Sequence, residues 1–307
     1  MKDRSKLTTE KRNVRTRDID RHTTLEIVDL INAEDAKVPP AVHKASKRIA
    51  EAAELVAESF RSGGRLFYVG AGTSGRLGVL DAAECPPTFG VPPTMVQGII
   101  AGGRRALVRS SEGAEDDPAA GASAIDSRRV SPRDTVVGIA ACGLTPFVRG
   151  ALARARKRGA STVFILCAPE AGRGIHADVV IPAVVGPEVI TGSTRMKAGT
   201  ATKLILNTLT TAAMIRIGKV YGNLMVDLRA RSTKLRDRAE RIVMAVTGVS
   251  RRRARALLRR ARGEAKSAIV MHARGCDYGT GKHIIAQAAG MLSSVLERRT
   301  REGKRQE

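Results

Sequence analysis

Short apolar segments alternate with longer amphipathic ones along the first two-thirds of the chain. Five runs rich in Val, Ile, Phe and Tyr predict strands, at 65–70, 94–100, 135–141, 161–168 and 178–185. Segments 74–83 and 145–159 lie between such runs and have helical periodicity. Short apolar strands that alternate with helices are typical of a mostly parallel sheet covered by helices on both faces. The pattern therefore predicts an α/β fold.

The residues N-terminal to this sheet region predict helices and no strands. Residues 1–22 are polar and predict an N-terminal arm. Leu25, Val28 and Ile31 recur at helical spacing after two threonines, which predicts a capped helix within 23–38. A second helix is expected at 40–61, ended by the glycine pair that follows it.

The last third of the chain predicts helices only. A long helix that is apolar on most sides runs to about Gly218, and the strand pattern has stopped by residue 230. Two short helices are expected within 248–275, with Ser250 as a cap and a turn at Gly263, and a third at 282–298. We therefore expect two domains, which are a sheet domain with its N-terminal arm at 1–229 and a small all-helical domain at 230–307.

Composition narrows the class of protein. The chain has 307 residues, of which 43% are hydrophobic and 27% charged, as in globular proteins with a sizeable core. Its longest apolar segment, 204–218, is interrupted by Asn207 and Arg216 and is too short to span a bilayer. The four cysteines form no CxxC pair and the five histidines no i,i+4 pair, so neither a disulfide framework nor a metal site is expected. The first residues lack the apolar core of a secretory signal, which favours a cytoplasmic location.

The high positive charge of the chain could indicate a nucleic-acid partner. The formal net charge is +23, and the arginines are densest at 251–262, where there are seven. Such a stretch is typical either of a nucleic-acid-binding face or of a solvated helix surface. Aromatic residues make up only 3% of the chain, so stacking platforms for bases are scarce. No helix-turn-helix pattern precedes the sheet region either, so a nucleic-acid partner is not expected.

A glycine-rich turn follows the first strand. Gly70, Gly72 and Gly75 have the spacing of a dinucleotide-binding loop, in which free N–H groups at a helix start face a phosphate. A dinucleotide site also needs a carboxylate after the second strand, and that strand runs into Ala-Gly-Gly instead. The variable positions, Thr73 and Ser74, add hydroxyl donors. We therefore expect this loop to bind a phosphate monoester rather than NAD, although a tight turn with capping hydroxyls has the same composition.

The segment at 192–203 repeats this arrangement. Gly192, Ser193 and Thr194 precede a predicted helix, and Lys197 is among the cations that follow. Two hydroxyl-rich loops after strands of one sheet favour a shared phosphate site.

With both loops in view, the sequence resembles the N-acetylmuramic acid 6-phosphate etherase family. The resemblance rests on 70–90 and 186–228, and also on 7–13, 23–42 and 112–117. It implies a sugar-isomerase (SIS-type) fold, with a flavodoxin-like three-layer arrangement. It also implies a homodimer with sites near the subunit interface, no metal and no cofactor. The implied reaction releases D-lactate from carbon 3 of a phosphorylated amino sugar.

The resemblance also assigns residues. It implies that Glu84 is the proton-donating acid and that Glu115 is a second catalytic carboxylate. Together with the loop analysis, the expected substrate-binding residues are Gly72, Thr73, Ser74, Cys142, Ser193, Thr194 and Lys197. The chain departs from the usual family pattern at Cys142, Leu144 and Phe147, where a serine, an arginine and a tyrosine are common. This departure leaves open a non-catalytic sugar-phosphate sensor of the same fold.

The position of Glu84 raises a geometric problem. A helix of about ten residues between the glycine loop and Glu84 is about 15 Å long, too long for one small sugar to bridge. Either the helix ends early, so that 84–90 folds back, or Glu84 serves the site of the partner subunit.

Overall fold

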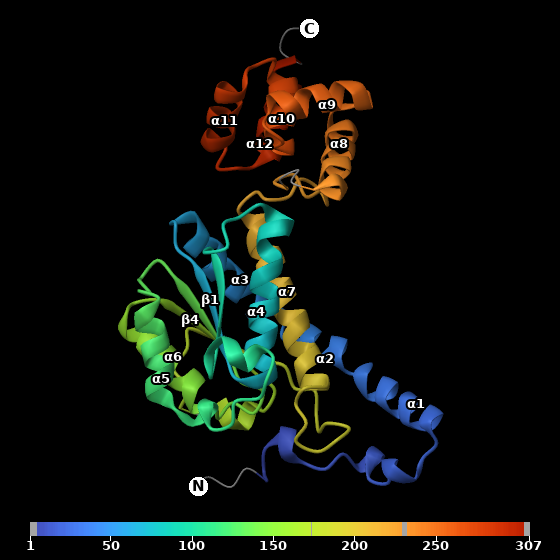
Figure 1. The fold of residues 1–307 in the computed structure, drawn as a ribbon, viewed down its shortest axis with the longest axis vertical. Helices are drawn as coiled ribbons and strands as arrows, with labels where there is room; N and C mark the ends of the chain where they lie inside the picture. Colours follow the sequence, from blue (N-terminus) through green and yellow to red (C-terminus); the bar gives the residue numbers. More distant parts are fainter. Residues whose placement is uncertain (1–4, 173, 229–231, 304–307) are drawn as a thin grey trace. The chain divides into compact units, whose positions relative to one another are not determined.

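The computed structural model describes residues 5–172, 174–228 and 232–303 (Figure 1). The chain divides into two compact units. The first consists of Met1–Ala83 and Pro93–Ala212, and the second of Glu84–Pro92 and Ala213–Glu307.

The first unit is built on a five-stranded sheet that is parallel throughout, as predicted. The strands are β1 (Leu66–Gly70), β2 (Val96–Ile100), β3 (Thr135–Ile139), β4 (Ser161–Leu166) and β5 (Val179–Pro182). Their order is β2-β1-β3-β4-β5, which is the flavodoxin-like order. Tyr68 pairs with Gly98 on one side and Val137 on the other, so these three side-chain positions share one face.

Helices cover both faces, which makes three layers (Figure 1). One face carries α5 (Pro118–Ser127) and α6 (Pro146–Lys157), which pack on an apolar cluster that includes Phe67, Val136 and Phe164. The other face carries α3 (Ser46–Arg61), α4 (Gly72–Phe89) and α7 (Lys197–Arg216). The α/β class and the cover on both faces are confirmed.

A buried carboxylate links three elements on the second face. Asp81 of α4 accepts hydrogen bonds from the Tyr68 hydroxyl at 2.9 Å and from the Asn207 amide at 2.7 Å. The Thr210 hydroxyl of α7 also donates to it, at 3.3 Å. These hydrogen bonds fix α4 and α7 against β1.

Several element boundaries differ from the prediction. The helix expected at 40–61 is two helices, α2 (Val38–Lys44) and α3, separated at Ala45. Helix α4 runs to Phe89, well past residue 83, although Pro86 and Pro87 lie inside it. The predicted helix within 23–38 is α1 (Thr24–Asp35), and its capping box between Thr23 and Glu26 confirms the expected start.

Part of the N-terminal arm is buried and ordered. It contains three 3₁₀ turns, at Thr8–Glu10, Val14–Thr16 and Ile19–Arg21. Leu7, Thr9, Asn13 and Thr16 are all less than 9% exposed. The arm predicted at 1–22 is therefore packed in part on the sheet domain, where its polar side chains find partners.

Further helices follow in the described residues of the second unit. They are α8 (Thr233–Thr247), α9 (Arg251–Arg260), α10 (Ala265–Arg274), α11 (Tyr278–Gln287) and α12 (Leu292–Gly303). Ser250 caps α9 as expected, whereas the helix predicted at 282–298 is broken at Ala289 and Gly290, both with positive φ. Lys266 is buried and donates to the carbonyls of Gly218 and Gly290 and to Asp227, so one cation joins three segments of this unit.

The crossing of α5 and α6 gives a first prediction. A Cβ added to Gly150 would lie 2.0 Å from the Pro118 carbonyl oxygen, so Gly150→Ala should force the helices apart. We expect a loss of about 1–3 kcal/mol in the free energy of unfolding, despite the better helix propensity of alanine. Urea unfolding measures it. Gly279→Ala in α11 is the control, because its Cβ would meet nothing closer than 3.6 Å, and an equal loss in both variants would contradict the packing argument.

Candidate functional site

The strand order places a topological switch point at one edge of the sheet. The chain leaves β1 toward α4 on one face and leaves β3 toward α6 on the other, so their loops diverge at the carboxyl ends of these strands. Ligands of open α/β sheets bind at such a switch point. Because all strands are parallel, the loops after β2 and β5 reach the same edge. Thr73, Cys142, Glu115 and Ser193 therefore lie on loops or helix starts at this edge.

The first glycine loop brings the start of α4 close to the end of β1. A Cβ on Gly70 would lie 2.6 Å from the backbone nitrogen of Gly75. The end of β1 and the first turn of α4 can therefore come this close only because Gly70 has no side chain. Gly72 has φ +52°, a conformation that favours glycine. The N–H groups in the first turn of a helix have no intrahelical acceptor, so those of Gly72, Thr73 and Ser74 can bind an anion.

The second loop lies directly beside the first. The methyl carbon of Thr73 and the carbonyl oxygen of Thr194 each lie 3.5 Å from the position of a Cβ on Gly199, in the first turn of α7. Thr73, Ser74, Ser193 and Thr194 are all half-buried. Among the described residues, none of these four hydroxyls forms a hydrogen bond. The structure thus brings together both hydroxyl-rich loops that the sequence singled out.

The two helix starts differ in the donors that they offer. The buried carboxylate of Glu188 accepts the N–H groups of Lys197 at 3.0 Å and Ala198 at 2.9 Å. Burial raises the pKa of Glu188, although these two hydrogen bonds act in the opposite direction. Two of the first N–H groups of α7 are therefore occupied, and any anion at this edge must rely on the N–H groups of α4 and on hydroxyls.

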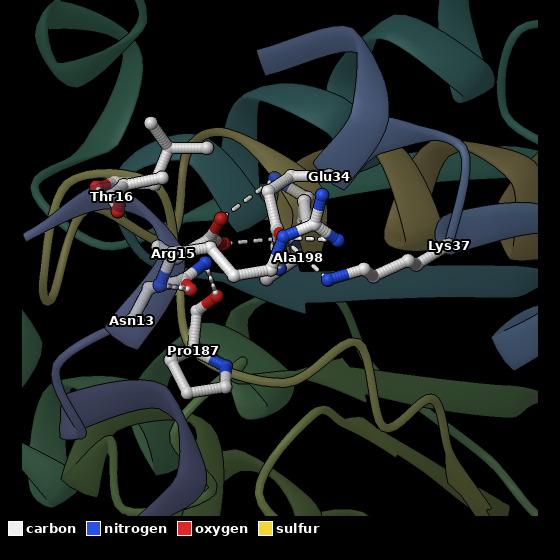
Figure 2. A network of polar contacts seen from close by, with 10 residues as sticks. Asn13, Arg15, Thr16, Glu34, Lys37, Pro187 and Ala198 are labelled. Carbon is white, nitrogen blue, oxygen red and sulfur yellow. Dashed lines mark hydrogen bonds and ion pairs between the residues drawn. The ribbon is translucent and has the colours of Figure 1, made fainter. Parts of the chain in front are cut away.

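Lys197 does not face the open edge. Its side chain is 1% exposed, and its ammonium pairs with Glu34 of α1 at 2.5 Å. Figure 2 shows Arg15 and Lys37 beside the same carboxylate. Burial acts to raise the pKa of Glu34, but hydrogen bonds from Lys197 and Lys37 outweigh it and bring the pKa to about 2. In this arrangement the lysine neutralises a buried carboxylate and does not present its charge to a ligand.

The N-terminal arm completes this network (Figure 2). The Asn13 amide donates to the Pro187 carbonyl at 3.3 Å, and the Thr16 hydroxyl donates to the Val189 carbonyl at 2.8 Å. The arm is thereby fastened to the segment that carries Glu188.

Two of the three residues that depart from the family pattern belong to one apolar contact. Cys142 and Leu144 pack with Leu7 of the arm and with Ala168 and Ala171. The Arg149 guanidinium donates hydrogen bonds to the Gly143 and Ala171 carbonyls at 3.0–3.1 Å and so holds the same loop in place. The thiol and Leu144 thus help to dock the arm, and a substrate contact by Cys142 stays a prediction.

The two candidate carboxylates lie in different surroundings. Glu115 is exposed on a 3₁₀ turn, Ala114–Asp116, in the loop that leaves β2, and so lies at the edge with the hydroxyl loops. Glu84 is exposed within the body of α4, and the rise along that helix from Gly72 to Glu84 is about 18 Å. Because α4 continues to Phe89, the fold-back of 84–90 is excluded.

Sequence reasoning missed the two buried acids around Lys197. Glu34 and Glu188 lie inside segments that carry the family resemblance, but nothing in their local pattern distinguishes them from surface carboxylates. A glutamate shortly before a helix start is the only signal for Glu188. Among the described residues, no group of three or more His, Cys, Asp or Glu can hold a metal ion, and no helix is long and apolar enough to cross a membrane.

Comparison with known proteins extends over nearly the whole chain. Residues 48–156 match the family described as glucokinase regulatory protein N-terminal SIS domain. An N-acetylmuramic acid 6-phosphate etherase of Gloeothece citriformis is 51% identical over 296 residues, which are 96% of this chain and 97% of that protein. An etherase of the same name from Mycolicibacterium smegmatis is 51% identical over 294 residues, 96% of this chain and 99% of that protein.

Among solved structures, phosphoheptose isomerase from Neisseria gonorrhoeae aligns with a TM-score of 0.47. It is 16% identical, and the alignment covers 62% of this chain and 99% of that protein.

The buried ion pair gives a prediction with a pH signature. Glu34→Gln should lower the free energy of unfolding at pH 7 by about 3–5 kcal/mol, because Lys197 is left buried without its counter-ion. The folded-state pKa of Glu34 is depressed, so its stabilisation is complete above the unfolded pKa near 4.5 and is lost as the pH falls toward 2. Urea unfolding at pH 7 and pH 3 should therefore show a smaller difference from wild type at pH 3.

Two further variants make this test specific. Glu58→Gln, which removes an exposed pair with Arg61, should cost less than about 1 kcal/mol. The double variant Glu34→Met with Lys197→Met should recover much of the loss at pH 7. An equal loss for Glu34→Gln at both pH values would contradict the assignment of the pair.

The hydroxyls of the two loops give a prediction for binding. Ser74→Ala and Ser193→Ala should each weaken binding of a sugar 6-phosphate by about 1–3 kcal/mol, if each hydroxyl donates to the charged phosphate. Calorimetric titration measures the affinity. Ser127→Ala is the control. Its hydroxyl donates to the Ala124 carbonyl at the C-terminal end of α5, away from both loops, so the affinity should stay unchanged. Unchanged affinity in both loop variants would overturn the phosphate assignment.

Proposed function

The chain belongs to the N-acetylmuramic acid 6-phosphate etherase family, and on that premise we propose that it cleaves the D-lactyl ether of N-acetylmuramic acid 6-phosphate. The products are N-acetylglucosamine 6-phosphate and D-lactate, and the enzyme is a carbon–oxygen lyase that serves the recycling of cell-wall sugars in the cytoplasm. The observation that carries this proposal is an identity of about half over nearly the full length of both chains.

The phosphate of the substrate binds at the start of α4. The N–H groups of Gly72, Thr73 and Ser74 point along the helix dipole toward it, and the hydroxyls of Ser193 and Thr194 approach from the adjoining loop. Glu188 holds that loop to α7 and keeps two further N–H groups occupied. The phosphate thereby anchors the sugar at the edge of the sheet, where Glu115 also lies.

The reaction is an elimination followed by hydration. In the open-chain sugar the aldehyde acidifies the proton on carbon 2, and a base removes it. The electron pair forms the double bond between carbons 2 and 3, and the bond from carbon 3 to the ether oxygen breaks. An acid protonates the departing lactate oxygen, because an alkoxide is a poor leaving group. Water then returns a hydroxyl to carbon 3 and a proton to carbon 2.

We assign Glu84 as this acid and Glu115 as the second carboxylate. Within one subunit, the length of α4 separates Glu84 from the phosphate loop by more than one amino sugar can bridge. The assignment therefore requires a homodimer, in which Glu84 of one subunit serves the phosphate loop of its partner.

Isotope labelling tests the reaction. The protein is incubated with N-acetylmuramic acid 6-phosphate in ¹⁸O-water, and D-lactate and the sugar product are analysed by mass spectrometry. We expect D-lactate without label and N-acetylglucosamine 6-phosphate with ¹⁸O at carbon 3. N-acetylmuramic acid without phosphate is the control and should react far more slowly. Tight binding of the phosphorylated sugar without lactate would instead identify a non-catalytic sugar-phosphate sensor.

Mixing inactive variants tests the shared site. Glu84→Gln and Glu115→Gln should each lower lactate release by about 10²–10⁴-fold. If each site takes these residues from different subunits, a hybrid dimer contains one intact site, and a random mixture regains about a quarter of wild-type activity. Differently tagged subunits that co-purify show that hybrids have formed. Hybrids without recovered activity would place both carboxylates in one subunit or remove Glu84 from the mechanism.

A further inference from the structure

The arginine-rich stretch of the helical unit lines a pocket that the etherase reaction does not use. Helices α8 and α9 pack against each other, and between them lies a cavity of about 440 Å³. Its polar lining consists of Arg236, Glu240, Arg255, Arg259 and Arg262, with Leu258 and Gly263 as apolar surface. Positions 236 and 240 are four apart on α8, and 255 and 259 are four apart on α9, so each helix turns one charged face to the cavity.

The charges in this pocket are not balanced. Its one carboxylate, Glu240, pairs with Arg255 at 2.8 Å and also with Arg251 at 3.3 Å. Within the described part of the chain, Arg236, Arg259 and Arg262 form no ion pair. Three exposed arginines without an ion pair in this part of the chain thus line one concavity, and an anion bound there would offset the repulsion between their charges.

Ordinary structural reasons explain only part of this arrangement. Cations are favourable at a helix C-terminus, which accounts for Arg259 near the end of α9. The same reason does not apply to Arg236, which lies in the first turn of α8, where a cation opposes the helix dipole.

Arg262 is held in an unusual conformation. Its φ is +54°, a region that glycine occupies at lower cost, and its guanidinium lies 4.8 Å from the centroid of the Tyr278 ring. Stacking on the ring orders the side chain before any ligand binds, which lowers the entropy cost of binding.

We propose that the pocket between α8 and α9 is a binding site for a small polyanion that carries two or more phosphate groups. Guanidinium groups match phosphate oxygens with paired hydrogen bonds, and three of them require more than one negative charge. The concave shape and the volume suit a small molecule. This site is distinct from the phosphate loop at α4, and the proposal stands independently of the etherase activity.

Calorimetric titration with inorganic pyrophosphate at low salt tests the proposal. The Ser74→Ala protein is the background, so that binding at the phosphate loop is weakened and the second site is observed. We expect Arg259→Gln and Arg262→Gln each to weaken pyrophosphate binding about tenfold, as for a lost hydrogen bond between charged groups. Inorganic phosphate should bind more weakly than pyrophosphate, because it bridges fewer of the arginines.

Arg260→Gln is the matched control. It lies beside Arg259 on the same exposed end of α9 and removes the same charge, but it does not line the pocket. We expect its pyrophosphate affinity to stay within about twofold of the background protein. Thermal unfolding without ligand checks that each variant is folded.

Three results would overturn the proposal. Equal weakening by Arg259→Gln and Arg260→Gln would show general attraction to a basic surface. If correctly folded Ser74→Ala protein does not bind pyrophosphate, the pocket between α8 and α9 is not a polyanion site. Binding of a 20-base-pair nucleic acid duplex that competes with pyrophosphate and is weakened by Arg260→Gln would assign the face to nucleic acid. None of these results bears on lactate release, so they are distinguishable from a failure of the proposed etherase function.

Discussion

The buried ion pair between Glu34 and Lys197 is the contact on which the geometry of the sheet edge depends. It joins α1 to the first residue of α7, and the N–H of that same lysine donates to Glu188. Asn13 and Thr16 then fasten the N-terminal arm to the segment around Glu188. Because buried charges are stable only with partners, loss of one member leaves the others uncompensated. The arm, the second loop and the start of α7 therefore act as one cooperative structure.

This structure gives the two helix starts at the edge different chemistry. The carboxylate of Glu188 occupies the first donors of α7, whereas glycines at 70 and 75 leave the first turn of α4 close to β1 and open to an anion. In the proposed site, a substrate phosphate takes at α4 the place that the Glu188 carboxylate takes at α7. We propose that the phosphate binds at α4 because the first donors of α7 are already occupied, and that the second loop contributes the hydroxyls of Ser193 and Thr194.

The sequence predicted the α/β class, the parallel strands and both hydroxyl loops, because these depend on local patterns of apolar residues and glycines. It did not predict that Lys197 is buried, since its partner Glu34 is distant in the chain and only tertiary packing brings the two together. The length of α4 was underestimated because Pro86 and Pro87 normally end a helix. Nor did the sequence connect Cys142 with its apolar neighbour Leu7, because the two are distant in the chain.

The central claim is that the substrate phosphate binds at α4 and that Glu84 reaches carbon 3 from the partner subunit. A crystal structure with N-acetylglucosamine 6-phosphate tests both parts at once. The account predicts phosphate oxygens within hydrogen-bonding distance of the N–H groups of Gly72, Thr73 and Ser74, with Glu84 of the second subunit near carbon 3. A phosphate bound away from α4, or a sugar approached by Glu84 of the same subunit, would contradict it.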